Sequence, residues 1–200
     1  MRVTQRIIGP KFQEAMLYAV EIHGGDLRKS TTIPYISHLF SVCALVLEDG
    51  GDEEEAIAAL LHDMLEDHPK EVTKQELERR FGSRVAEIVA VCTDTPPNYK
   101  GGPKPPWRKR KAAYIDRLRE EKYPRCRVPL ADKLHNVRTI VNDYRRIGND
   151  IWARFKATKK EQLRYHRSLV EAFREANGPA YLVDELDKLV AELEMSDKSA

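Results

Sequence analysis

The residues best suited to chemistry are His62, Asp63, Glu66 and Asp67, which share one six-residue segment. They follow an almost continuous apolar run from Ala56, so we expect them at the end of a buried helix. Burying polar groups without partners costs roughly 2–7 kcal/mol for a neutral group and more for a charge. On a helix His62 shares a face with Glu66, and Asp63 with Asp67, and imidazole with carboxylate suits manganese, iron or magnesium. A self-satisfied polar cluster or a solvated helix end is the simpler alternative.

Two further ionisable residues interrupt apolar segments elsewhere in the chain. His38 lies in one such stretch, and Asp132 lies in the run 128–134. A lone histidine in such a place is more often structural than a ligand. Counting the segment 62–67, three expected helices nevertheless each contain an ionisable residue that can bind a metal and whose burial without a partner is unfavourable. One divalent ion would account for all of them.

The elements that must position these residues are helices, because alternation typical of strands is nearly absent. Asp52 with Glu55, and Thr158 with Glu161, form capping-box patterns at two helix starts. The proline-rich stretch 94–107 favours a loop. We therefore predict an all-α fold, a compact helical bundle. The expected helices span residues 11–23, 34–49, 52–65, 73–82, 83–93, 107–120, 128–146, 158–178 and 180–194.

The composition fits one globular domain. Of the 200 residues, we assign 1–195 to a single domain and 196–200 to a polar, disordered tail. A net charge of +2 neither demands nor excludes a nucleic-acid partner. No apolar run reaches the roughly 20 residues that cross a bilayer, and the N-terminus is unlike a signal peptide. The three cysteines form no Cys-x-x-Cys pair, so we expect the protein in a reducing cytoplasm. Because no long apolar run is present, we expect no membrane partner.

The order of His38, His62–Asp63 and Asp132 resembles the metal-binding set of the HD-domain phosphohydrolase superfamily. The context is more specific than the His-Asp doublet, and it resembles the hydrolase domain of RelA/SpoT homologues over about residues 10–175. In size the chain is most similar to the small alarmone hydrolases. The segments that carry the resemblance are Ala-Leu-Leu-His-Asp-Met-Leu-Glu-Asp at 59–67, Phe-Gly-Ser-Arg-Val at 81–85, Leu-Ala-Asp-Lys-Leu-His-Asn-Val-Arg at 130–138, Pro-Tyr-Ile-Ser-His at 34–38 and Arg-Lys at 28–29.

This resemblance implies hydrolysis of the 3′-pyrophosphate of guanosine tetra- and pentaphosphate, with one divalent ion, manganese first among the candidates. A divalent ion lowers the pKa of its water and neutralises phosphate charge, nearby carboxylates can take the proton, and cations can hold a polyanion. The resemblance implies these metal ligands: His38, His62, Asp63 and Asp132. It implies that the water is positioned and activated by Glu66 and Asp67. It implies that the substrate pocket is lined by Arg28, Lys29 and Asn136.

The stretch 94–111 departs from the family pattern, because it is proline-rich and then strongly basic. We expect cations of the run 108–111, Lys109 among them, to bind phosphates of a nucleotide polyphosphate. A solvated face is the alternative for at least two of the four, since adjacent helix residues point in different directions.

The substrate identity stays open at this point. The nearest rival is another HD phosphohydrolase, acting on a different nucleotide or on the phosphate of NADPH. A non-catalytic nucleotide sensor has no need of Glu66 and Asp67, and a nucleic-acid module would show a wider basic stripe. The sequence permits a homo-oligomer without specifying one.

Overall fold

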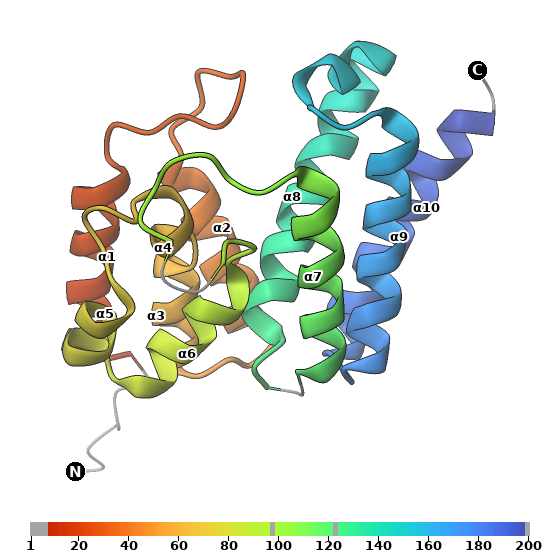
Figure 1. Ribbon diagram of the computed structural model, residues 1–200. Coiled ribbons are helices and arrows are strands. Elements are labelled where there is room, and N and C mark those ends of the chain that lie inside the picture. The colour runs from red at the N-terminus through yellow and green to blue at the C-terminus, as the bar shows by residue number, and fades with distance from the viewer. Residues whose placement is uncertain (1–7, 97–98, 122–123, 199–200) are drawn as a thin grey trace. The chain divides into compact units, whose positions relative to one another are not determined.

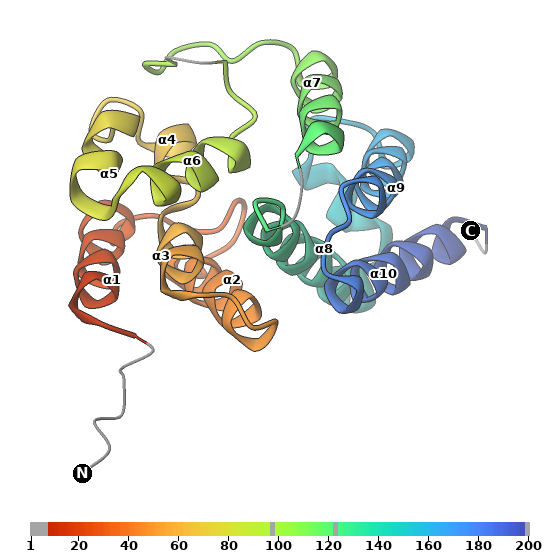
Figure 2. The ribbon, with the colours of Figure 1, turned by 90° about the horizontal axis from the view of Figure 1, so that it is seen from below.

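The computed structural model describes residues 8–96, 99–121 and 124–198, which fold almost entirely as helices (Figures 1 and 2). No strand occurs within these ranges, where an isolated antiparallel bridge pairs Leu27 with Pro34. The all-α prediction is confirmed. The chain divides into two compact units, one built from residues up to 93 with 99–101 and the other from 94–96 and the residues from 102 onward.

The first unit is organised around α3 (Glu53–Leu61), whose side chains from Glu55 to Leu61 are all buried. It packs against α1 (Pro10–His23), α2 (Ile36–Glu48) and α6 (Ser83–Cys92). Two short helices, α4 (Met64–Asp67) and α5 (Lys74–Phe81), complete the unit, and α5 packs on α6. Burial on every side fits the apolar sequence of α3.

The start of α3 follows the predicted capping box. The Asp52 carboxylate accepts from the Glu55 backbone N–H at 3.0 Å, and the Asp52 N–H donates to the Glu55 carboxylate at 3.1 Å. The turn before it depends on glycine, because Gly50 has a φ of +78°. A Cβ on Gly51 would lie 2.7 Å from the Val46 carbonyl oxygen, so a larger residue at position 51 would clash with the backbone of α2.

One local prediction in this unit was wrong, and another was right only in part. The expected continuous helix over 52–65 ends at Leu61, and His62 and Asp63 form a turn before α4. The spacing of apolar residues in the sequence also predicts a buried α1 face of Phe12, Met16, Ala19, Val20 and His23, of which Ala19 and His23 are buried but Met16 is 38% and Val20 49% exposed. The helix buries Ala15 and other small or aromatic residues instead, and small side chains let it pack closely on α3.

The second unit contains α7 (Trp107–Glu120), α8 (Arg127–Ile147), α9 (Lys159–Glu175) and α10 (Ala180–Lys198). The helix α8 packs against α10, and α9 packs against both α7 and α10. A 3₁₀ segment, η1 (Gly148–Arg154), was not predicted; it begins at Gly148, which has a φ of +59°, and packs against α8. The α10 helix continues through 198, beyond the predicted end at 194, and residues 199–200 lie outside the described part.

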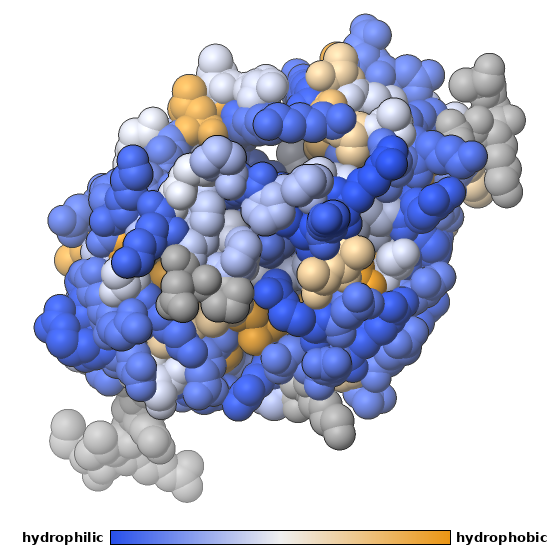
Figure 3. All heavy atoms as spheres, viewed as in Figure 1, coloured by the Kyte–Doolittle hydropathy of each residue, from blue (hydrophilic) through white to orange (hydrophobic). Residues whose placement is uncertain are grey.

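The surface is mostly hydrophilic on the face that Figure 3 shows, with apolar residues in small separate patches. Within the described residues no helix is both long and apolar enough to span a bilayer. Scattered exposed apolar side chains are ordinary on folded proteins.

Candidate metal centre

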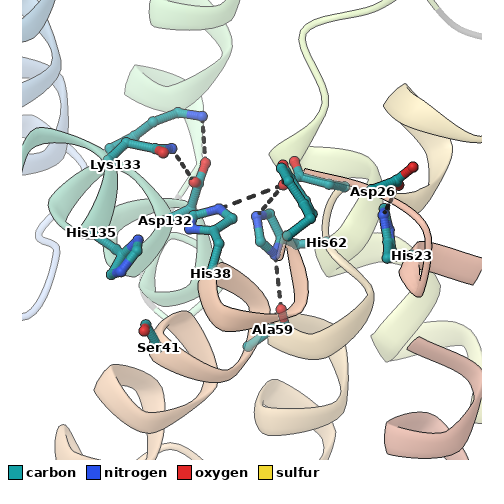
Figure 4. A network of polar contacts seen from close by, with 12 residues as sticks. His23, Asp26, His38, Ser41, Ala59, His62, Asp132, Lys133 and His135 are labelled. Atoms are coloured by element: carbon teal, nitrogen blue, oxygen red, sulfur yellow. Dashed lines mark hydrogen bonds and ion pairs between the residues drawn. The ribbon is translucent and has the colours of Figure 1, made fainter. Parts of the chain in front are cut away.

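Three of the four predicted metal ligands converge in the first unit. His38 on α2 and His62 at the end of α3 are fully buried, and their ring centroids lie 5.1 Å apart (Figure 4). The Asp63 Oδ2 atom lies 2.8 Å from His62 Nε2 and 3.6 Å from His38 Nε2. Two imidazole nitrogens and a carboxylate oxygen therefore share one small volume, and this donor set suits a divalent transition ion.

A backbone carbonyl fixes the orientation of the His62 ring. The His62 Nδ1 atom lies 2.8 Å from the Ala59 carbonyl oxygen, to which it donates, and Figure 4 shows this contact. The proton is held on Nδ1, so the Nε2 lone pair faces Asp63. Metal-binding histidines commonly have their tautomer set by such a bond.

Tyr35 holds the Asp63 carboxylate from the other side. The Tyr35 hydroxyl donates to Asp63 Oδ2 over 2.5 Å, and the Tyr35 ring packs edge-on against the His38 ring at 5.5 Å. The same phenol ring carries the Arg28 guanidinium 5.6 Å from its centroid. Tyr35 was not singled out from the sequence, although it directly precedes α2 and lies three residues before His38.

The predicted substrate residues Arg28 and Lys29 lie in the loop between α1 and α2. Backbone bonds shape this loop: the Arg28 N–H donates to the Ile33 carbonyl at 2.8 Å, and its own carbonyl accepts from Thr31. Arg28 is half-buried over Tyr35, whereas Lys29 is exposed. The structure thus links Arg28 to the metal ligands more directly than Lys29.

The predicted catalytic acids Glu66 and Asp67 both lie on α4. Their backbone N–H groups donate to the Asp63 carbonyl at 3.0 and 2.9 Å, which anchors α4 to the same turn that presents the metal ligand. Glu66 is half-buried and Asp67 is exposed. Their roles in handling water stay predictions.

In the second unit, Asp132 is buried on α8 and accepts hydrogen bonds from neighbouring side chains. Lys133 Nζ donates to Asp132 Oδ2 and Asn136 Nδ2 donates to Asp132 Oδ1, both at 2.5 Å. Burial disfavours the Lys133 ammonium, yet Asp132, Tyr114 and Tyr165 raise the pKa of Lys133 well above its ordinary value. Asn136, predicted from the family to contact substrate, is held here by the predicted metal ligand.

The basic run 108–111 divides into exposed and bound cations. Lys109 is exposed, and Arg108 pairs with Glu161 on the surface at 2.5 Å. Arg110 and Lys111 instead hold Asp94, with Lys111 Nζ 2.8 Å from its carboxylate. Burial opposes ionisation of Asp94, but the two cations keep the pKa of Asp94 below its ordinary value. The solvated-face alternative therefore fits two of the four.

Sequence reasoning missed a group of polar side chains around Lys111 and Lys133. Burial and then these two ammonium groups lower the pKa of His166 to about 3, so its ring is neutral at pH 7. Neither ring nitrogen of His166, nor the Tyr165 hydroxyl, has a hydrogen-bond partner among the described residues. Lys111 and Tyr165 also line a groove of about 650 Å³ between α7 and α9, to which Lys109 does not contribute. A lysine in a helical sequence does not indicate which buried side chains its ammonium group contacts, so this group could not be predicted.

The chain matches the HD domain family over residues 15–162, and it therefore belongs to that family. The guanosine-3′,5′-bis(diphosphate) 3′-pyrophosphohydrolase MESH1 of Xenopus tropicalis is 34% identical over 82% of this chain and 86% of its own length. An enzyme of the same name without the MESH1 label, from Aquifex aeolicus, is 46% identical over 83 residues. The bifunctional (p)ppGpp synthase/hydrolase SpoT of Escherichia coli K12 is 33% identical over 65% of this chain. The chain spans only 12% and 18% of these two bacterial relatives.

Solved structures show the same fold. A metazoan orthologue of SpoT that hydrolyses ppGpp aligns with a TM-score of 0.75 at 23% identity, over 94% of this chain and 98% of its own. A protein from Listeria monocytogenes EGD-e aligns with a TM-score of 0.64 at 28% identity, over 76% of this chain and 96% of its own. The family resemblance stated from the motifs is confirmed.

Proposed function

We propose that this protein is a metal-dependent phosphohydrolase that removes the 3′-pyrophosphate from guanosine 3′,5′-bis(diphosphate). The observation that carries the proposal is the convergence of His38, His62 and Tyr35 on one oxygen of Asp63. The MESH1 relative from Xenopus tropicalis, which is similar over most of its length, bears the name of this activity. The relative from Aquifex aeolicus, which is similar over an 83-residue segment, bears the same name. Membership of the HD domain family supports a hydrolytic reaction at a divalent ion.

We propose that one divalent ion, manganese first among the candidates, is held by His38, His62 and Asp63 and by Asp132 as the fourth ligand. The donor set fits, because two neutral imidazoles and carboxylates match divalent first-row ions. The ion, when bound, supplies Lewis acidity and lowers the pKa of a bound water. The Lys133 and Asn136 contacts orient the Asp132 carboxylate.

The chain's own residues perform the remaining tasks. Glu66, half-buried three residues after Asp63, accepts the proton from the attacking water, and Asp67 positions that water. Because Glu66 takes the proton, the metal ligands keep their own protonation states through the reaction.

Binding a polyanion requires a positive field from side chains. Arg28 and Lys29 supply it from the α1–α2 loop, and Asn136 adds an amide donor from α8. We retain Lys109 as a phosphate contact and add Lys111. The ion pair with Asp94 and the contact with the Tyr165 ring hold Lys111 in a fixed position. Charge-assisted contacts of this kind are the strong ones in phosphate recognition.

The experiment is steady-state turnover of a nucleotide panel with added Mn²⁺. The panel pairs guanosine carrying a 3′-pyrophosphate with its 3′-monophosphate counterpart, and includes NADPH as the alternative phosphate ester. We expect pyrophosphate release from the first substrate alone, and loss of that release in Glu66→Ala. Turnover of another phosphate ester without cleavage of any 3′-pyrophosphate would assign the protein to a different HD phosphohydrolase activity. Nucleotide binding without any turnover would make it a sensor.

A further inference from the structure

A second cluster of metal-ligand type lies in the first unit, outside the candidate metal centre. It consists of His23, the last residue of α1, Asp26, in the loop that follows, and His68, which directly follows α4. Figure 4 shows His23 and Asp26 together, apart from His38 and His62. None of the three residues has a task in the reaction proposed above.

The three side chains meet at one oxygen atom. Asp26 Oδ2 lies 2.8 Å from His23 Nδ1 and 2.7 Å from His68 Nε2, and one ligand atom from each residue falls within 4.8 Å of the others. Ligand atoms around a tetrahedral zinc ion lie about 3.3 Å apart, given bonds of about 2.0–2.1 Å. Entry of an ion therefore requires these contacts to open by only about 0.5 Å.

An outer carboxylate orients the His68 ring as it does in many metal sites. The Glu71 Oε1 atom lies 3.2 Å from His68 Nδ1, the nitrogen that does not face Asp26. A carboxylate on the far nitrogen fixes the tautomer and makes the near nitrogen a better ligand. His68 is thus arranged to present Nε2 toward the position where an ion would bind.

His23 also suits the role of a ligand. Its side chain is fully buried, the Tyr35 ring stacks on it at 5.2 Å, and the His68 ring meets it edge-on at 4.7 Å. Its Nε2 atom has no hydrogen-bond partner among the described residues. When Nδ1 binds an ion, the neutral ring carries its proton on Nε2, and no existing hydrogen bond at Nε2 has to break for this tautomer to form.

The cluster is open to solvent on one side. The Asp26 side chain is 38% exposed and the His68 side chain 16% exposed, while His23 forms the buried floor. An ion can enter past Asp26, and water can complete its coordination. Two imidazoles and one carboxylate with an open position form the ligand type of several zinc sites.

We propose that His23, Asp26 and His68 form a second divalent-ion site, selective for zinc and similar late first-row ions. Such an ion joins the end of α1, the start of the loop that carries Arg28, and the residue directly after α4. It therefore fixes the substrate-contacting loop relative to the helix that bears Glu66 and Asp67. The site's existence does not depend on the proposed reaction.

The test counts ions in a background that lacks the first site. Full-length Asp63→Ala protein is stripped with a chelator and dialysed against Zn²⁺ or Co²⁺, and bound ion is measured by elemental analysis and by Co²⁺ d–d absorption. We expect one ion per chain in this background and none after adding either Asp26→Asn or His68→Gln. Glu71→Gln should weaken binding about 10–100-fold, as loss of an outer partner does.

The matched control is Glu78→Gln on α5, which makes the same charge change at an exposed residue and should leave the ion count unchanged. Circular dichroism confirms that each variant is folded. An Asp63→Ala protein that binds no ion, or Asp26→Asn and His68→Gln variants that still bind one, would overturn the proposal and leave a hydrogen-bonded His–Asp–His cluster. The readout is binding, so a failure here says nothing against the phosphohydrolase reaction.

Discussion

Tyr35→Phe removes one hydroxyl group and should weaken Mn²⁺ binding at the candidate metal centre by about 10–100-fold. The hydroxyl donates to Asp63 Oδ2 over 2.5 Å, a contact between a phenol and a charged ligand. Loss of a hydrogen bond to a charged group costs roughly 1.5–3 kcal/mol, and about 1.4 kcal/mol is a factor of ten in a binding constant. The phenylalanine ring keeps the packing against His23 and His38, so only the orientation of the carboxylate is lost.

The assay is a Mn²⁺ titration of chelator-stripped protein followed by electron paramagnetic resonance of the free ion. Tyr18→Phe is the matched control, because the Tyr18 hydroxyl also donates to a carboxylate, Glu76, at 3.1 Å in the same unit. Burial and then Glu76 raise the pKa of Tyr18 to about 12, so that bond is intact at neutral pH. Equal Mn²⁺ affinity in the two variants would refute the positioning role of Tyr35.

Three further outcomes are expected. Glu66→Ala should keep the fold and the Mn²⁺ but lower kcat about 10²–10⁴-fold, as loss of an acid–base group does; a near wild-type kcat in stopped assays would move the role to another residue. Arg28→Ala should raise KM for the 3′-pyrophosphate substrate at least about tenfold from the loss of one charge-assisted contact, and Lys29→Ala should raise it less, because Lys29 is exposed whereas Arg28 is half-buried over the Tyr35 ring; equal KM shifts would contradict this order. The backbone N–H of Thr158 first, then its hydroxyl and Arg108, lower the pKa of Glu161 from 4.5 to about 2, so its stabilisation is present above about pH 4.5 and is lost as pH falls toward 2; thermal melts should show a smaller loss over that window in Glu161→Gln, and identical pH profiles would speak against it.

The helix starts were predictable because the physics there is local. The Thr158–Glu161 pair forms both bonds of a capping box, as a pattern within four residues should. The loop predicted over 94–107 rested on an equally local signal, since proline removes backbone donors and fixes φ; residues 97–98 of it lie outside the described part. These signals need no knowledge of the rest of the chain, and α7 begins at Trp107, as expected.

The buried face of α1 was not predictable from hydrophobic periodicity. Periodicity weights large apolar residues such as Met16, which the structure leaves 38% exposed. The helix buries Ala15 and Ala19 completely, and it packs against α3, where small side chains allow a close approach. The choice between the two faces depends on the partner helix, which the α1 sequence does not contain.

The candidate metal ligands could be found because each is a costly exception in an apolar segment. Residues that act through others carry no such mark. Tyr35 reaches Asp63 across 28 positions, and His68 reaches Asp26 across 42. Neither residue type is unusual at its position in the sequence, so only the fold shows that each contacts a carboxylate.

The break between α3 and α4 shows why a polar site can lie at the end of a buried helix. The last four carbonyls of any helix lack intrahelical donors, and here the His62 ring satisfies one of them at Ala59. That single bond fixes the tautomer that presents Nε2 to Asp63. The Asp63 carbonyl then accepts from the N–H groups of Glu66 and Asp67, so the same turn that presents the carboxylate also starts the helix bearing Glu66.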